Sequence, residues 1–228
     1  MPTLAVLDCF FIKGLITEDS STITELNLTH CFLERKDFDK IAAGFTSLRK
    51  LSYCVDPPEN GGEGEPWTSA QEVCEALYPR RDTLRELSIS YDHFESLSTH
   101  NPTACCFLPK LTGLERLSLN VNTLSDLRKS LPLAAPIGKL FPSSLRRVDM
   151  CLGRTSAHWL QPYLDWLSTR TDFCPNLQYV KICHHAFPPD PEIANLFRAR
   201  GANYTFSRNF DHDDYKLYVR SLSRVILY

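Results

Sequence analysis

The chain has 228 residues, of which 43% are hydrophobic and 23% are charged. Such a chain is long enough for one large domain or a short array of repeats and can bury roughly 70% of its unfolded surface, which excludes a wholly disordered protein. Its 25 basic and 27 acidic side chains leave a net charge of -2, a balance that gives no electrostatic footprint for nucleic acid or for an anionic membrane.

One pattern, apolar-x-x-apolar-x-apolar, recurs in order along the chain. Its seven instances begin at Leu4, Ile23, Leu48, Leu84, Leu114, Leu145 and Leu177. The period of two at the end of each instance predicts a short strand with alternate side chains pointing inward. The intervals leave room for a helical return to the next parallel strand. The sequence therefore predicts an α/β fold, a leucine-rich-repeat solenoid with a curved parallel sheet of about seven or eight strands and irregular helical returns.

Between these strands, apolar residues recur at the spacing of a helical face. The pattern predicts helices at residues 35–45, 69–78, 156–169 and 192–200. Thr68 or Ser69 is expected to cap the second helix, and Gly201 is expected to end the last one in a left-handed conformation. Residues 123–141 are ambiguous, because two prolines interrupt a helix-like pattern. A final strand is predicted at residues 202–206.

We expect residues 1–210 to form one leucine-rich-repeat domain and residues 211–228 to form a C-terminal extension. The domain would carry an acidic loop insertion at residues 56–66, where prolines and glycines alternate with carboxylates. Such a segment cannot bury itself. Its acidic part, from Asp56 to Glu65, is a candidate second binding patch, and a solvated insertion without a function is the alternative.

The predicted strands would align their outward residues into three ladders. The first ladder is Val6, Glu25, Lys50, Glu86, Arg116, Arg147 and Tyr179. The second is Asp8, Asn27, Ser52, Ser88, Ser118, Asp149 and Lys181, and the third is Phe10, Thr29, Cys54, Ser90, Asn120, Cys151 and Cys183. From Glu25 to Arg116 the charges alternate, so neighbouring strands would present opposite charges about 5 Å apart.

The like-charge pair of Arg116 and Arg147 could meet an acidic group of a partner. The candidate partner-binding residues are Glu86, Arg116, Arg147, Tyr179 and Lys181. The alternative is that these charges satisfy one another on an ordinary solvated sheet face. The second and third ladders are mostly small and polar, so they could receive a loop or peptide but offer no aromatic cluster as an anchor.

The sequence carries no motif that supports an enzyme. It has no nucleophile elbow, no cysteine-protease signature and no phosphate-binding loop, so we expect no catalytic residues, no metal and no cofactor. Cys151, Cys183 and His185 would lie near one another and could supply three soft ligands, but their spacing matches no common zinc signature. A metal-dependent or thiol enzyme built on these three residues is the competing hypothesis, and a degenerate fragment without activity is a third.

We expect a cytoplasmic or nuclear protein. The first residues lack a basic segment, and Asp8 interrupts their apolar run, which argues against a signal peptide. No apolar run approaches the roughly 18 residues of a membrane-spanning helix. The nine cysteines are an odd number and include no Cys-x-x-Cys pair, which is typical of reduced, packed thiols.

Several segments resemble the leucine-rich-repeat regions of filamentous-fungal F-box proteins. The segments are Glu75-Ala76-Leu77-Tyr78-Pro79-Arg80-Arg81-Asp82-Thr83-Leu84-Arg85-Glu86-Leu87, then Leu111-Thr112-Gly113-Leu114-Glu115-Arg116-Leu117, Phe141-Pro142-Ser143-Ser144-Leu145-Arg146-Arg147-Val148 and Cys174-Pro175-Asn176-Leu177-Gln178-Tyr179-Val180. The resemblance covers residues 23–206. It implies the target-binding part of a ubiquitin ligase, in which an F-box engages a Skp-type adaptor and the repeats bind the protein to be ubiquitinated.

The chain departs from that family in one respect. The first repeat begins at Leu4, and no residues match an F-box, so the chain looks like the repeat half alone. Adaptor binding carries over only if a missing F-box is supplied. We therefore expect a non-enzymatic protein–protein interaction module, for which the resemblance implies target recognition in ubiquitination.

Overall fold

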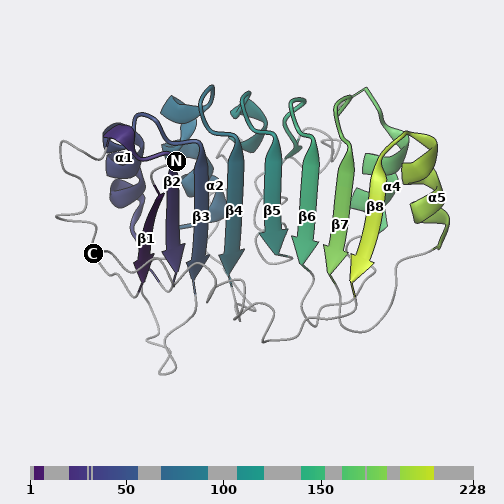
Figure 1. Ribbon diagram of the computed structural model, residues 1–228, viewed down its shortest axis with the longest axis horizontal. Coiled ribbons are helices and arrows are strands. Elements are labelled where there is room, and N and C mark those ends of the chain that lie inside the picture. The colour runs from purple at the N-terminus through teal and green to yellow at the C-terminus, as the bar shows by residue number, and fades with distance from the viewer. Residues whose placement is uncertain are drawn as a thin grey trace.

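The computed structural model describes residues 3–7, 21–29, 31, 33–55, 68–91, 107–120, 140–151, 161–172, 174–183 and 191–207. Its strands form one sheet of eight, all parallel, in the order in which they occur along the chain (Figure 1). The strands are β1 (Thr3–Leu7), β2 (Glu25–Thr29), β3 (Lys50–Val55), β4 (Glu86–Tyr91), β5 (Arg116–Asn120), β6 (Arg147–Cys151), β7 (Tyr179–Cys183) and β8 (Asn203–Ser207). The α/β class and the strand number that the sequence predicts are confirmed.

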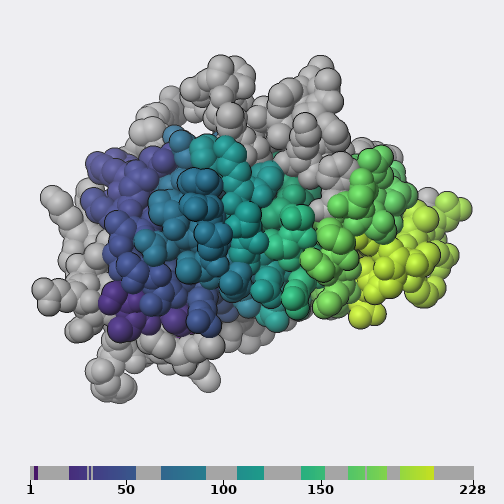
Figure 2. Space-filling model, turned by 90° about the horizontal axis from the view of Figure 1, so that it is seen from above, coloured from purple at the N-terminus to yellow at the C-terminus, as the bar shows by residue number. Residues whose placement is uncertain are grey.

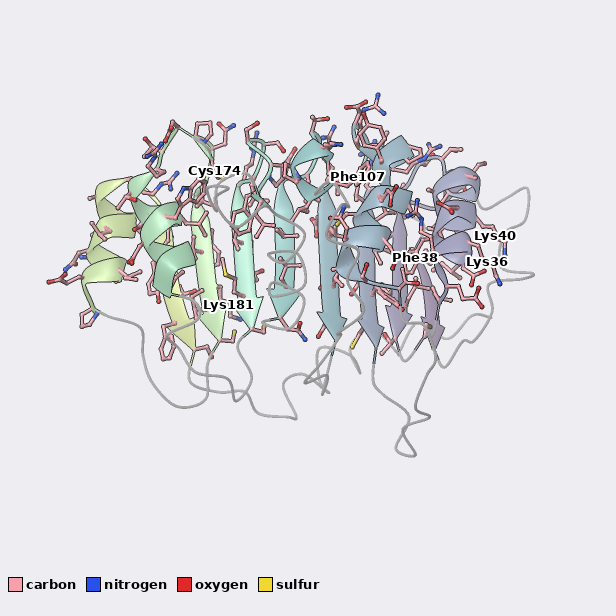
Figure 3. All side chains as sticks on the ribbon, turned by 180° about the vertical axis from the view of Figure 1, so that it is seen from behind. Lys36, Phe38, Lys40, Phe107, Cys174 and Lys181 are labelled. Atoms are coloured by element: carbon pink, nitrogen blue, oxygen red, sulfur yellow. The ribbon has the colours of Figure 1, made fainter. Side chains whose placement is uncertain are left out.

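The helices of the described chain cover one face of the sheet. They are α1 (Arg35–Gly44), α2 (Ala70–Ala76), α4 (Gln161–Thr169) and α5 (Pro191–Ala199), with two 3-10 turns, η2 (Tyr78–Arg80) and η3 (Leu108–Lys110). Seen from behind, these helices stand in front of the strands (Figure 3). Seen from above, the elements follow one another along the long axis in chain order (Figure 2).

The helix termini lie within two residues of their predicted positions where both are described, and α2 ends at Ala76 rather than at Tyr78. Ser69 caps α2, and its hydroxyl accepts the backbone N–H of Glu72 while the Glu72 carboxylate accepts the N–H of Ser69. After α5, Gly201 has a φ of 80°, a left-handed conformation that glycine adopts without strain. The predicted helix at 156–169 is described from Gln161 onward and ends at Thr169.

The core consists of the inward strand residues and the apolar sides of the helices. Two rows of registered side chains are buried in it: Leu26, Leu51, Leu87, Leu117, Val148 and Val180, and beside them Leu28, Tyr53, Ile89, Leu119, Met150 and Ile182. Phe38 of α1 packs edge-on against Tyr53, with ring centroids 4.9 Å apart. The core is thus continuous from β2 to β7.

The turns into the central strands share one hydrogen-bond pattern. The carbonyl of Arg49 accepts the N–H groups of Arg85 and Glu86, and the carbonyl of Arg85 in turn accepts those of Glu115 and Arg116. The next two turns continue the same pattern, and the N···O distances across the series are 2.7–3.0 Å. Because each carbonyl takes two consecutive donors of the next unit, the turns hold neighbouring strands in one register.

The predicted register of the first strand is wrong by three residues. The sequence pattern aligns Val6 with Glu25, whereas β1 pairs Thr3 with Glu25 and Leu4 with Leu26. Two alternations in this segment fit a period of two, one that begins at Leu4 and one that begins at Leu7. The structure has the first, in which Leu4 packs against the core. The outward partners predicted for this strand, Asp8 and Phe10, lie outside the described residues.

Other sequence predictions fall on parts of the chain that the structure does not describe. These are the acidic insertion at 56–66, the C-terminal extension at 211–228 and most of the ambiguous segment at 123–141. Among the helices that the structure describes, none has both the length and the apolar character needed to cross a membrane.

We predict that Leu87→Ala lowers the free energy of unfolding by about 2–5 kcal/mol, because Leu87 is 1% exposed at the centre of the core and its truncation leaves a cavity. The matched control, Ser88→Ala, changes the opposite side of the same strand and should stay within about 0.5 kcal/mol. Urea denaturation followed by circular dichroism measures both. Equal losses in the two variants would contradict the assignment of the two faces.

Candidate functional site

The face of the sheet opposite the helices is the candidate site, and we call it the open face. Its side chains are the residues that alternate with the buried rows, and it is the face nearer the viewer in Figure 1. At its β2–β3 end three of these side chains are buried, with Asn27 2%, Thr29 6% and Cys54 7% exposed. From β4 to β8 the corresponding residues are partly or fully exposed. Among the described strands, the most accessible part of the open face therefore runs from β4 to β8, and Glu25, Lys50 and Ser52 are partly exposed beside it.

The alternating charges of the predicted first ladder form a row of ion pairs. Lys50 Nζ lies 3.8 Å from Glu25 Oε2 and 4.0 Å from Glu86 Oε2, and Arg116 Nη1 lies 3.1 Å from Glu86 Oε1. The prediction of opposite charges on neighbouring strands is confirmed. Each pair is partly exposed, so it contributes at most about 1 kcal/mol, but a shifted register would place like charges together.

Arg116 and Arg147 lie side by side in register, as predicted, and each has a carboxylate partner of its own. The Arg147 Nε donates to both oxygens of Asp149, at 3.1 and 2.9 Å. Its guanidinium also stacks over the ring of Tyr179, 4.5 Å from the centroid. Arg116 pairs with Glu86 and remains 59% exposed. The bifurcated hydrogen bond and the stacking hold Arg147 in one orientation before any partner arrives.

Tyr179 and Lys181 complete a cluster around Arg147. The Tyr179 hydroxyl and the Thr205 hydroxyl form a hydrogen bond of 2.8 Å across β7 and β8. Lys181 pairs in register with Asp149 on one side and Thr205 on the other. On the open face of β5 to β7, the three cations Arg116, Arg147 and Lys181 therefore accompany a single carboxylate. This part of the face is basic and carries one flat aromatic ring.

A second row of charges, which was not predicted from the sequence, lies at the turns that precede the strands. Glu115 lies between Arg85 and Arg146, with N···O distances of 3.9 and 3.7 Å. Arg85 also donates through Nη1 to the Gly113 carbonyl at 2.7 Å. The signal was present in the sequence, because the residue before each strand repeats at the same spacing as the strand residues. These arginines add positive charge at the edge of the sheet where the strands begin.

Two thiols lie together on the open face, at the ends of strands β6 and β7. Cys151 and Cys183 are partners in the register of β6 and β7, and both are half-buried free cysteines. The interaction with the neighbouring Cys151 thiol lowers the pKa of Cys183 to about 7. The Lys181 ammonium also lowers this pKa, whereas burial and the Asp149 carboxylate raise it. The same interaction between the thiols, together with burial, holds the pKa of the Cys151 thiol well above its ordinary value.

The predicted three-ligand cluster is thus described only in part. Cys151 and Cys183 come together, whereas His185 lies outside the described residues. Within the ranges that the structure describes, no group of three or more His, Cys, Asp or Glu side chains could hold a metal ion.

Comparison with known protein families and with curated proteins found no match to this chain. The resemblance to the repeat regions of F-box proteins therefore stays a prediction from the sequence.

We predict that Lys50→Glu lowers the free energy of unfolding by about 1 kcal/mol at low salt, because it places three carboxylates in one row with Glu25 and Glu86. Lys50→Gln, which removes the attraction without adding repulsion, should lose less. In 1 M salt the Debye length falls to about 3 Å, so the difference between the variants should shrink. Denaturant midpoints at the two salt concentrations measure this, and a salt-independent difference would contradict the ion-pair row.

Proposed function

We propose that this chain is a non-enzymatic protein-interaction module of the leucine-rich-repeat class, and that the accessible open face binds an acidic segment of a partner protein. The observation that carries the proposal is the basic cluster of Arg116, Arg147 and Lys181 beside the ring of Tyr179. Arginine and tyrosine are the residue types that most often dominate protein interfaces.

The assignment of the fold to the leucine-rich-repeat class is itself part of this proposal. Three features support it: the seven in-order sequence patterns, the buried rows in a common register, and the turns that repeat one pattern of hydrogen bonds. Repeat proteins of this kind use the strand face as an extended binding surface. A solenoid also explains why successive strands are neighbours along the whole sheet.

The charge distribution favours an acidic partner. On β5 to β7 only Asp149 opposes three cations, and it is already bound to Arg147. Glu86 at the border pairs with Arg116 and would set the register of an approaching segment by repelling its carboxylates. The contact residues that we propose are those predicted from the sequence: Glu86, Arg116, Arg147, Tyr179 and Lys181.

The resemblance to F-box proteins gives this binding a biological setting. In this proposal the open face would recruit a target for ubiquitination, in the cytoplasm or the nucleus. A Skp-type adaptor would bind only through an F-box supplied in addition to these 228 residues, since none of them matches that motif. The acidic insertion at 56–66 would offer a second, oppositely charged contact.

The double charge reversal Arg116→Glu/Arg147→Glu tests the proposed face. We expect it to reduce recovery of partner proteins, captured on the immobilised chain and quantified by mass spectrometry, at least tenfold, because two attractive contacts become repulsive. An acidic peptide that binds the wild-type chain in fluorescence anisotropy should lose affinity in parallel.

The matched control is Arg170→Glu/Arg198→Glu, which makes the same change of charge at exposed positions on the helical side. It should leave both the recovered proteins and the peptide affinity unchanged. If the two double variants lose the same partners, the loss reflects net charge alone, and the open face is not the binding surface.

A further inference from the structure

The pair of Cys151 and Cys183 has a geometry that the binding function does not use. The two residues are partners in register on neighbouring parallel strands, and their side chains point to the same, open face. Neighbouring strands lie about 4.8 Å apart, which is within the range of roughly 4.4–6.8 Å between Cα atoms that a disulfide bridges. Both are free, half-buried cysteines.

We propose that Cys151 and Cys183 form a thiol–disulfide exchange site, in which Cys183 attacks a disulfide substrate and Cys151 resolves the mixed disulfide. This inference goes beyond the proposed binding function and does not rest on it. The substrate class is a disulfide with an accessible sulfur, either a low-molecular-weight disulfide or one exposed on a protein.

The surroundings of the pair assign the two roles. Cys183 faces Cys151 and Asp149 from β6 and Lys181 from its own strand, whereas Thr205 and Ser207 on β8 are uncharged. The neighbouring Cys151 thiol and the Lys181 ammonium stabilise the thiolate of Cys183 and lower its pKa to about 7. Cys151 keeps its proton, since its pKa is raised. Cys183 shares its strand with the Lys181 cation and Cys151 shares its strand with the Asp149 carboxylate, so we assign Cys183 as the nucleophile and Cys151 as the resolving thiol.

The reaction balances without a further cofactor. The Cys183 thiolate attacks one sulfur of the substrate disulfide, the substrate S–S bond breaks, and the first substrate thiolate leaves. Cys151 then gives up its proton to a released thiolate and attacks Cys183 Sγ, which expels the second substrate thiolate. The two cysteines lose two electrons in forming their disulfide, and the substrate gains them as it becomes two thiols.

Two other described cysteines, Cys54 and Cys174, lack the features of this pair. Cys54 occupies the same ladder on β3, but its neighbours in register are Thr29 and Ser90, and it is buried. Cys174 lies in the core, where burial raises its pKa to about 11. Neither has a second thiol opposite it in the register of the sheet.

Two opposing effects set how much faster Cys183 attacks a disulfide than an ordinary cysteine does: a larger ionised fraction and a less nucleophilic thiolate. At pH 7 a thiol with a pKa near 7 is about half ionised, compared with about 3% for an ordinary cysteine. The less basic thiolate is in turn about fivefold less nucleophilic. The net gain for Cys183 is therefore about threefold, and the resolving step by Cys151 is the more distinctive signature.

The test uses the chromogenic disulfide 5,5'-dithiobis(2-nitrobenzoate) on the full chain carrying Cys9→Ser, Cys105→Ser and Cys106→Ser, because these three cysteines lie outside the described residues and would add their own reaction to the count. We expect a fast phase that releases two thionitrobenzoate ions per chain and leaves a Cys151–Cys183 disulfide, identified by peptide mass spectrometry. With Cys151→Ala added, the fast phase should release one ion and leave the mixed disulfide on Cys183. With Cys183→Ser added, the fast phase should disappear.

Cys54→Ser is the matched control and should leave the fast phase unchanged, and circular dichroism checks that each variant is folded. A second measurement is the pH dependence of Cys183 alkylation, which should be half-maximal near pH 7 and move to higher pH in Cys151→Ala. The proposal is overturned if the fast phase survives in Cys183→Ser, if Cys151→Ala still releases two ions, or if the alkylation profile does not move.

Discussion

The register of the inward aliphatic side chains is the constraint on which the rest of the structure depends. Leu51, Leu87 and Leu117 lie opposite one another on parallel strands because each strand has the same period of two and only one side of the sheet is covered by the described helices. A slip by one residue would expose this row and bury a row of charges. Apolar burial therefore decides where every polar side chain of the open face lies.

The positions of the functional side chains on the open face follow from this packing. Lys50 meets Glu25 and Glu86 because the leucines that follow them in each strand are aligned. Cys151 meets Cys183 for the same reason, further along the sheet. Parallel sheets are usually covered on both faces, and their strands then read as continuous apolar runs. Here the strands alternate, which leaves one face polar and brings chemically distinct side chains into rows.

Much of this arrangement could be predicted from the sequence. The repeated pattern predicted the strands from β2 to β7 and their pairing, since an interior strand has a neighbour on each side to satisfy. The last strand, β8, was predicted separately, from the segment that follows Gly201. The edge strand β1 was misaligned because Leu4 and Leu7 each begin an acceptable alternation, and a strand with one neighbour is less constrained. The helix ends were predictable where local chemistry decides them, as with the capping box at Ser69 and the left-handed Gly201.

The side-chain geometry of the candidate site could be predicted only in outline. The ladders placed Arg147 beside both Arg116 and Tyr179, but they could not show that Arg147 turns away from the like charge to stack on the ring and bind Asp149. Similarly, they placed Cys151 beside Cys183 without indicating how the surroundings shift the pKa of each thiol. Those shifts depend on the contact between the thiols, on burial and on the positions of Lys181 and Asp149, all of which require three-dimensional coordinates.

The two proposed sites share Asp149 and Lys181, and this makes them interdependent. Asp149 binds Arg147 and opposes ionisation of Cys183, whereas Lys181 belongs to the basic cluster and favours it. An acidic segment that engaged Lys181 would weaken its effect on the thiol and raise the pKa of Cys183. By reciprocity, converting Cys183 from a thiolate into a neutral disulfide would remove a negative charge and strengthen the binding of that segment. On this proposed surface, the oxidation state of the cysteine pair therefore sets the affinity for the acidic segment.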